Sequence, residues 1–127
     1  MNVISMNGYL WKIIFVDPDS IELMDQTGRK TLAVTIPSSF QIKMSKNLYG
    51  SKLLTVLIHE LAHCAIFSFN LLPDIHRMVK EQYWTEAEEW ICNFIADYGM
   101  TIFKSAYSIV GIDAWIFIPQ EIEKLIA

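Results

Sequence analysis

Two histidines and a glutamate in one short apolar segment have the residue types and spacing of a hydrolytic metal centre. His59, Glu60 and His63 form an HExxH motif inside the apolar run 53–72. On a helix, positions i and i+4 lie on one face one turn apart, so both imidazoles can bind one Zn²⁺ ion. Glu60 follows the first histidine and can act as general base toward water activated by that ion. The motif therefore indicates a zinc-dependent hydrolase.

The same three residues could also form a hydrogen-bonded cluster in the core without a metal. The segment around them is apolar on nearly every side, so we expect a central, buried helix. Burying two imidazoles and a carboxylate in such surroundings is unfavourable unless partners satisfy them. We favour the metal site, because an ion supplies such a partner and because HExxH seldom arises by chance in a short chain.

A catalytic zinc ion generally has three protein ligands and one open position, so the two histidines need a third partner. The acidic residues downstream are Glu86, Glu88 and Glu89. Glu88 can complete a capping box with Thr85 as the helix N-cap. Glu86 would lie in the first helical turn, where the helix dipole stabilises a carboxylate. Glu89 has neither role, so we expect it to be the third ligand, with Glu86 and Glu88 as the alternatives.

Segments 58–63 and 89–96 together resemble the ImmA/IrrE-like family of zinc metallopeptidases. Its members carry HExxH on one helix and an E-x-x-A-N-x-F-A-type segment on the next; the second segment here is Glu-Trp-Ile-Cys-Asn-Phe-Ile-Ala. Cys92 stands where the family prefers alanine, and Ile95 where it prefers phenylalanine. The resemblance covers roughly residues 31–104.

This resemblance implies an α+β fold of the minimal zincin, gluzincin-like type. In it, a small, mostly antiparallel three-stranded sheet packs on the HExxH helix and on a second helix that carries the glutamate. One zinc ion per chain would bind His59, His63 and Glu89, with Glu60 as the catalytic base. Without an attached DNA-binding domain, the chain looks most like the short stand-alone forms of phages and prophages. Relatives of that kind cleave or help to inactivate a repressor protein, so we expect a regulator of a mobile element as the substrate.

Three strands are predicted before the HExxH helix, each bounded by turn residues. The last of them alternates apolar and polar residues, as a half-exposed strand does. We expect this strand to be the sheet edge along which an extended peptide substrate pairs. The predicted strands are 9–16, 31–36 and 40–44.

Local signals also mark where the helices begin and end. Ser51 is the predicted N-cap of the HExxH helix, and Asn70 is expected to end it. A helical turn is predicted around 75–79. The second long helix is expected to start at Thr85 and to run past Gly99 or stop there. Residues 115–118 look extended, and 119–127 look like a short terminal helix.

Hydrolysis of a peptide bond needs a second donor, besides the metal, for the developing oxyanion. His76, Tyr83 and Tyr98 are candidates that the sequence does not rank, and His76 can equally be an exposed histidine without a role. Asn93 can orient a metal-binding histidine, or it can belong to a solvated polar stripe.

A non-catalytic alternative is a metal-containing protein-binding module that inhibits a host or phage regulator. A site closed by a fourth protein ligand, His76 or Cys92, would favour that function over catalysis. Cys64 and Cys92 could bind zinc as thiolates, although free cysteines are more often small, buried apolar residues.

The composition limits the remaining possibilities. With 127 residues, we expect a single domain over 1–127. A net charge of −4 argues against nucleic-acid binding. Ionisable side chains within 53–72 argue against a membrane span. Two cysteines and no secretory signal fit the cytoplasm. The native metal (zinc, or Mn²⁺, Fe²⁺ or Co²⁺), the substrate and the oligomeric state stay open.

Overall fold

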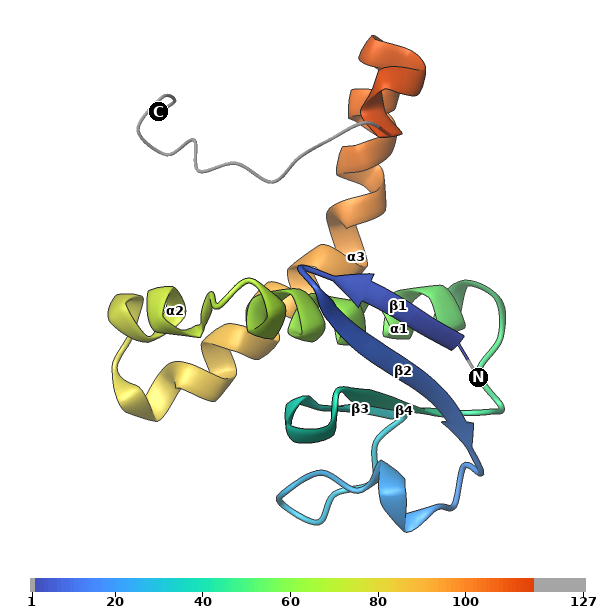
Figure 1. Cartoon of the computed structure of the whole chain (residues 1–127), viewed down its shortest axis with the longest axis vertical. Helices are drawn as coiled ribbons and strands as arrows, with labels where there is room; N and C mark the ends of the chain where they lie inside the picture. The colour runs from blue at the N-terminus through green and yellow to red at the C-terminus, as the bar shows by residue number, and fades with distance from the viewer. Residues whose placement is uncertain (1, 116–127) are drawn as a thin grey trace. The chain divides into compact units, whose positions relative to one another are not determined.

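The computed structural model describes residues 2–115. Figure 1 shows a small sheet with helices on one of its faces. The backbone forms two compact units, Met1–Asp97 and Tyr98–Ala127. The first unit holds the whole sheet and the HExxH helix, so it is the unit that matters for the site.

The sheet has four strands in the order β1-β2-β4-β3. The β1–β2 and β3–β4 pairs are antiparallel, whereas β2 and β4 run parallel. The α+β class is confirmed, but the predicted number of three strands is wrong. The strands are β1 (Asn2–Met6), β2 (Tyr9–Val16), β3 (Ala33–Ile36) and β4 (Gln41–Ser45).

The strand missing from the prediction, β1, forms a hairpin with β2. Met6 pairs with Tyr9, so only Asn7 and Gly8 lie between the strands. Both have positive φ, 49° and 83°. A two-residue loop of this kind needs positive φ at both positions, and Asn-Gly is the sequence that favours it most. The signal for this strand was therefore present in the sequence.

The expected edge strand 40–44 is in fact an interior strand. β4 lies between β2 and β3, and the edges of the sheet are β1 and β3, both of which contact α1. Ile42 and Met44 on β4 are fully buried. Alternating polarity shows that one face of a strand is buried. In a sheet with one solvated face, interior and edge strands both alternate in this way, so the pattern does not distinguish them.

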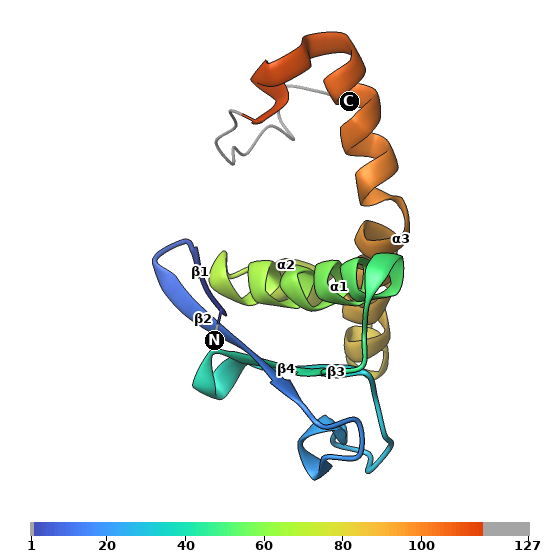
Figure 2. The same cartoon turned by 90° about the vertical axis from the view of Figure 1, so that its right-hand side faces the viewer.

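The HExxH helix α1 (Gly50–Ser68) lies across one face of this sheet (Figures 1 and 2). Trp11, Ile13, Ile42 and Met44 pack beneath it. The fully buried Trp11 also donates from Nε1 to Ser68 Oγ, 2.9 Å away, at the C-terminal end of the helix. Burial of this apolar face holds α1 in place on the sheet.

Ser51 is not the N-cap of α1, contrary to the prediction. The N-cap is Tyr49, which makes no side-chain capping bond, and Ser51 lies in the first turn. The chain enters the helix through Gly50 with φ 61°, a conformation that glycine adopts without strain. At the other end Asn70 takes the left-handed conformation (φ 54°), which ends the helix as predicted.

A short helix and a 3-10 turn connect α1 to the second long helix. These elements are α2 (Leu72–Met78), η3 (Glu81–Tyr83) and α3 (Trp84–Val110). Thr85 is therefore inside α3 rather than its N-cap, because η3 leads directly into the helix. Trp84 secures this junction by donating from Nε1 to the carbonyl oxygens of His76 and Val79.

Gly99 does not interrupt α3, which continues to Val110. Trp115 belongs to a 3-10 turn, η4 (Gly111–Trp115), and is not extended as predicted. The remaining residues of the predicted extended segment and terminal helix, 116–127, lie outside the described residues.

Among residues 2–115, α1 is the one helix whose length and apolar composition would allow it to cross a membrane. The core helix of a soluble protein has the same two properties. Placing His59, Glu60 and His63 in a bilayer would cost considerable free energy. The apolar face of the helix packs on the sheet instead. The cytoplasmic location remains a prediction.

The packing under α1 gives a testable expectation for stability. Ile42→Ala should lower the free energy of unfolding by about 2–5 kcal/mol, because it leaves a cavity between sheet and helix. Leu10→Ala, on the uncovered face of the neighbouring strand and with Leu10 64% exposed, should change it by no more than about 0.5 kcal/mol. Urea denaturation measures both values, and equal losses would contradict this assignment of the core.

Candidate metal centre

The two histidines of the motif face each other across one turn of α1. The ring centroids of His59 and His63 are 4.9 Å apart, and their Nε2 atoms are 3.2 Å apart. Their side chains are mostly buried, with 18% and 12% exposed. The i, i+4 spacing thus places both Nε2 atoms at one point on the helix surface.

A carboxylate from α3 contacts both of these nitrogen atoms. Glu89 Oε2 lies 3.2 Å from His59 Nε2, and Glu89 Oε1 lies 3.0 Å from His63 Nε2. Ligand atoms bound at about 2.0–2.1 Å in a tetrahedral arrangement lie about 3.3 Å from one another. The three separations in this cluster therefore suit a small divalent ion with tetrahedral ligands.

Glu60 lies beside the histidines, and a residue of the sheet holds its side chain through a hydrogen bond. His59, Glu60 and His63 form a group whose ligand atoms lie within 4.8 Å of one another and which could hold a metal ion. Glu60 Oε2 is 3.7 Å from His59 Nε2, farther than either oxygen of Glu89 from its nearest histidine. Glu60 Oε1 accepts a hydrogen bond of 2.9 Å from Thr35 Oγ1 on β3. The distances thus favour Glu89 over Glu60 beside the two nitrogens.

Glu88 occupies a different position from the one predicted for it. Because Thr85 is inside α3, the capping box cannot form. Instead, Glu88 Oε2 lies 2.5 Å from Nδ1 of His63, on the side of the ring opposite Nε2. Glu86, the other alternative ligand, is exposed in the first turn of α3, as expected for a carboxylate that the helix dipole stabilises.

The carboxylates of the cluster favour protonated imidazoles. Burial opposes a charge on His63, but hydrogen bonds with Cys92, Glu88 and Glu89 outweigh it and raise the pKa of His63 to about 12. The hydrogen bond with Glu89 likewise raises the pKa of His59. Hydrogen bonds from His59 and then His63 lower the pKa of Glu89. The side chains of the cluster thus form an ion-paired network.

Glu60 behaves in the opposite way. Its side chain is 7% exposed, and burial raises its pKa, although the hydrogen bond from Thr35 partly opposes the shift. A carboxylate whose pKa is raised toward neutrality can both accept and return a proton.

The other residues singled out from the sequence do not join the cluster. His76 stacks on Trp84 with centroids 3.9 Å apart, and Tyr83 is half-exposed in η3. Asn93 is exposed on α3. In the described part of the chain, no hydrogen bond or ion pair joins any of these three side chains to His59, Glu60 or His63. Tyr98 belongs to the second unit.

The two cysteines are free and buried. Cys64 is part of the core between α1 and the sheet, and burial raises its pKa to about 12. Cys92 is buried beside His63, and burial raises its pKa as well. A raised pKa keeps both thiols protonated at neutral pH, as expected of small apolar residues.

Thr35 is the residue of this site that sequence reasoning missed. It was predicted only as part of a strand, and its partner Glu60 is 25 residues away in the chain. Threonine is common in strands for reasons of packing, so its residue type carries no signal of such a contact.

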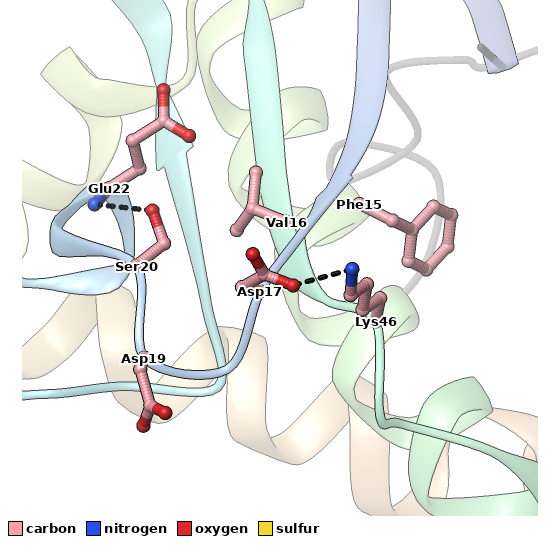
Figure 3. Close-up of a pocket in the computed structure, with 7 residues that line it drawn as sticks. All are labelled: Phe15, Val16, Asp17, Asp19, Ser20, Glu22 and Lys46. Carbon is pink, nitrogen blue, oxygen red and sulfur yellow. Dashed lines mark hydrogen bonds and ion pairs between the residues drawn. The ribbon is translucent and has the colours of Figure 1, made fainter.

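An open hollow of about 500 Å³ lies elsewhere, at the end of β2 (Figure 3). Its three acidic side chains are already paired with lysines: Asp17 with Lys46 at 2.5 Å, Asp19 with Lys30 at 2.8 Å and Glu22 with Lys43 at 3.3 Å. None of the histidines or carboxylates of the cluster lines it. The hollow is therefore separate from the candidate metal centre.

No family model matches this chain, and neither the curated proteins nor the solved structures include one that is significantly similar to it.

The raised pKa values of His59 and His63 predict that metal binding releases protons. A raised histidine pKa means a proton that must leave before Nε2 can bind an ion, so apparent metal affinity should rise with pH. At pH 7 we expect about one to two protons released per ion. Calorimetry in buffers of different ionisation enthalpy measures this number. His76→Ala should leave it unchanged, and a binding enthalpy independent of buffer would contradict the prediction.

Proposed function

We propose that this chain is a zinc-dependent metallopeptidase, as its resemblance to the ImmA/IrrE-like family implies. The observation that carries the proposal is the meeting of the Glu89 carboxylate with the Nε2 atoms of His59 and His63, at separations of 3.0–3.2 Å. These three side chains would hold the ion, and the gluzincin-like form of the zincin fold is part of the same proposal.

The reaction is hydrolysis of a peptide bond. A bound zinc ion supplies polarisation of the scissile carbonyl group and a lowered pKa for water at the site. Glu60 removes a proton from the attacking water at its carboxylate and passes it to the leaving amine. Its burial raises its pKa and so keeps it basic, while the hydrogen bond from Thr35 holds the carboxylate in one orientation.

The edge strand β3 is the place where we expect an extended substrate to bind. Ser45 N–H donates to Leu32 C=O, and the antiparallel register then directs the backbone groups of Val34 toward β4. The backbone groups of Ala33 and Thr35 consequently point away from β4. A peptide that pairs with them would add a strand to the sheet. Since the Thr35 side chain reaches Glu60, such a peptide would lie beside the catalytic base.

The resemblance suggests a repressor of a mobile element as the substrate. The net charge of −4 continues to favour a protein over a nucleic acid as the partner. The non-catalytic alternative, a module that inhibits a regulator by binding it, differs in one respect that can be tested: it does not need Glu60.

Two substitutions separate metal binding from catalysis. Glu60→Gln should keep about one zinc ion per chain and lower the rate of hydrolysis at least about 10²–10⁴-fold, because the base is lost. Glu89→Ala should lose both zinc and activity, whereas Glu86→Ala should lose neither. Zinc content is measured by atomic emission, and hydrolysis with a peptide library or a regulator co-expressed with the chain. If Glu60→Gln inactivates the regulator as well as the wild type does, the peptidase proposal is wrong.

The contact between β3 and the base gives a further prediction. Thr35→Val removes the hydroxyl group that holds Glu60 but keeps the shape of the side chain. A hydrogen bond to a charged group contributes about 1.5–3 kcal/mol, so kcat should fall about tenfold or more while zinc content stays the same. The control is Thr55→Val on α1, where the hydroxyl donates only to Ser51 C=O. Equal kcat values for the two variants would show that Thr35 does not position the base.

A further inference from the structure

Glu88 and Glu89 hold opposite sides of the same imidazole ring. Glu89 Oε1 lies 3.0 Å from Nε2 of His63, and Glu88 Oε2 lies 2.5 Å from its Nδ1. Consecutive helical residues point about 100° apart, so neighbouring carboxylates on α3 can reach both edges of a ring that enters between them. Cys92, one turn after Glu88 and fully buried, also contacts His63.

The two nitrogens of a neutral imidazole have different tasks at a metal. One offers a lone pair to the ion, and the other carries the ring proton. A carboxylate beside the second nitrogen keeps the proton there and fixes the orientation of the ring. Glu88 is placed at Nδ1 in this way, and its side chain is only 25% exposed, so water competes little for the contact.

The two histidines are not equivalent in this respect. The contacts of His59 with Glu60, Glu89 and His63 all involve Nε2. Within the described residues, only His63 has a carboxylate at Nδ1.

We infer that Glu88 is a positioning residue for the metal: its carboxylate holds the proton on Nδ1 of His63 and so presents Nε2 to the ion. The inference rests on the proposed metal site, but it assigns Glu88 a role outside the ligand set, in place of the capping role that its sequence context suggested. His63 becomes the ligand whose orientation is fixed in advance.

The test compares zinc affinity in the full chain with Glu88→Ala, Glu88→Gln and the control Glu86→Ala. Competition with a chromogenic chelator gives the dissociation constant. Glu88→Ala should weaken zinc binding about 10–100-fold, and Glu86→Ala should not change it. Glu88→Gln should weaken it less than Glu88→Ala, because an amide oxygen still accepts the bond but lacks the charge. Thermal unfolding and circular dichroism check that each variant is folded.

A second measurement reports on the ring itself. In the zinc-loaded wild type, ¹⁵N–¹H spectra of the imidazoles should show a proton on Nδ1 of His63 that exchanges slowly with water, and this signal should broaden or disappear in Glu88→Ala. A folded Glu88→Ala variant that binds zinc as tightly as the wild type, or coordination of zinc by Nδ1, overturns the inference about Glu88 alone. A wild-type chain that takes up no zinc overturns the metal site and this inference with it. Zinc bound without any hydrolysis of peptides overturns only the peptidase proposal and leaves the role of Glu88 standing.

Discussion

Two imidazoles and three carboxylates meet between α1 and α3, and the rest of the fold can be understood from the need to hold them there. Groups of this kind are unfavourable in a partly buried setting unless each has a partner. His59 and His63 share Glu89, His63 also has Glu88, and Glu60 has Thr35. In the described residues, no buried side-chain nitrogen or oxygen lacks a hydrogen-bond partner. The protein itself thus supplies a partner for each of these five side chains.

The sheet supports this network in two ways: it holds α1 in place, and its residue Thr35 contacts Glu60. The covered face, with Trp11, Ile42 and Met44 fully buried, fixes the axis of α1 and so the direction in which its histidines point. Asn7 Nδ2 and Trp11 Nε1 both donate to Ser68, which secures the far end of the same helix. The proposed metal centre, whose ligands would have to stay within a few tenths of an ångström, benefits from such support on a regular element.

The local parts of this site could be predicted from the sequence, and the long-range parts could not. The spacing of His59 and His63 is a property of one helix, so the motif alone predicts that they meet. The choice of Glu89 needed elimination and the resemblance, because its partner lies on another helix. Glu88 was assigned to a cap because a helix start one residue earlier cannot be recognised from Thr85 alone. The strand order could not be predicted either, because it depends on distant parts of the chain. Alternation along 40–44 indicates a buried face but does not identify the neighbouring strands.

The central position of β4 has a consequence for how the molecule assembles. Parallel strands cannot be joined by a tight turn, so the β2–β4 pair forms only after the whole segment between them has folded back. Contacts between distant parts of a chain form slowly, because loop-closure entropy opposes them until they are made. Thr35 reaches Glu60, 25 residues away in the chain, only when α1 has docked on the sheet, whereas His59 and His63 come together as soon as α1 is helical. We therefore expect the two imidazoles to come together before the contact between Thr35 and Glu60 forms.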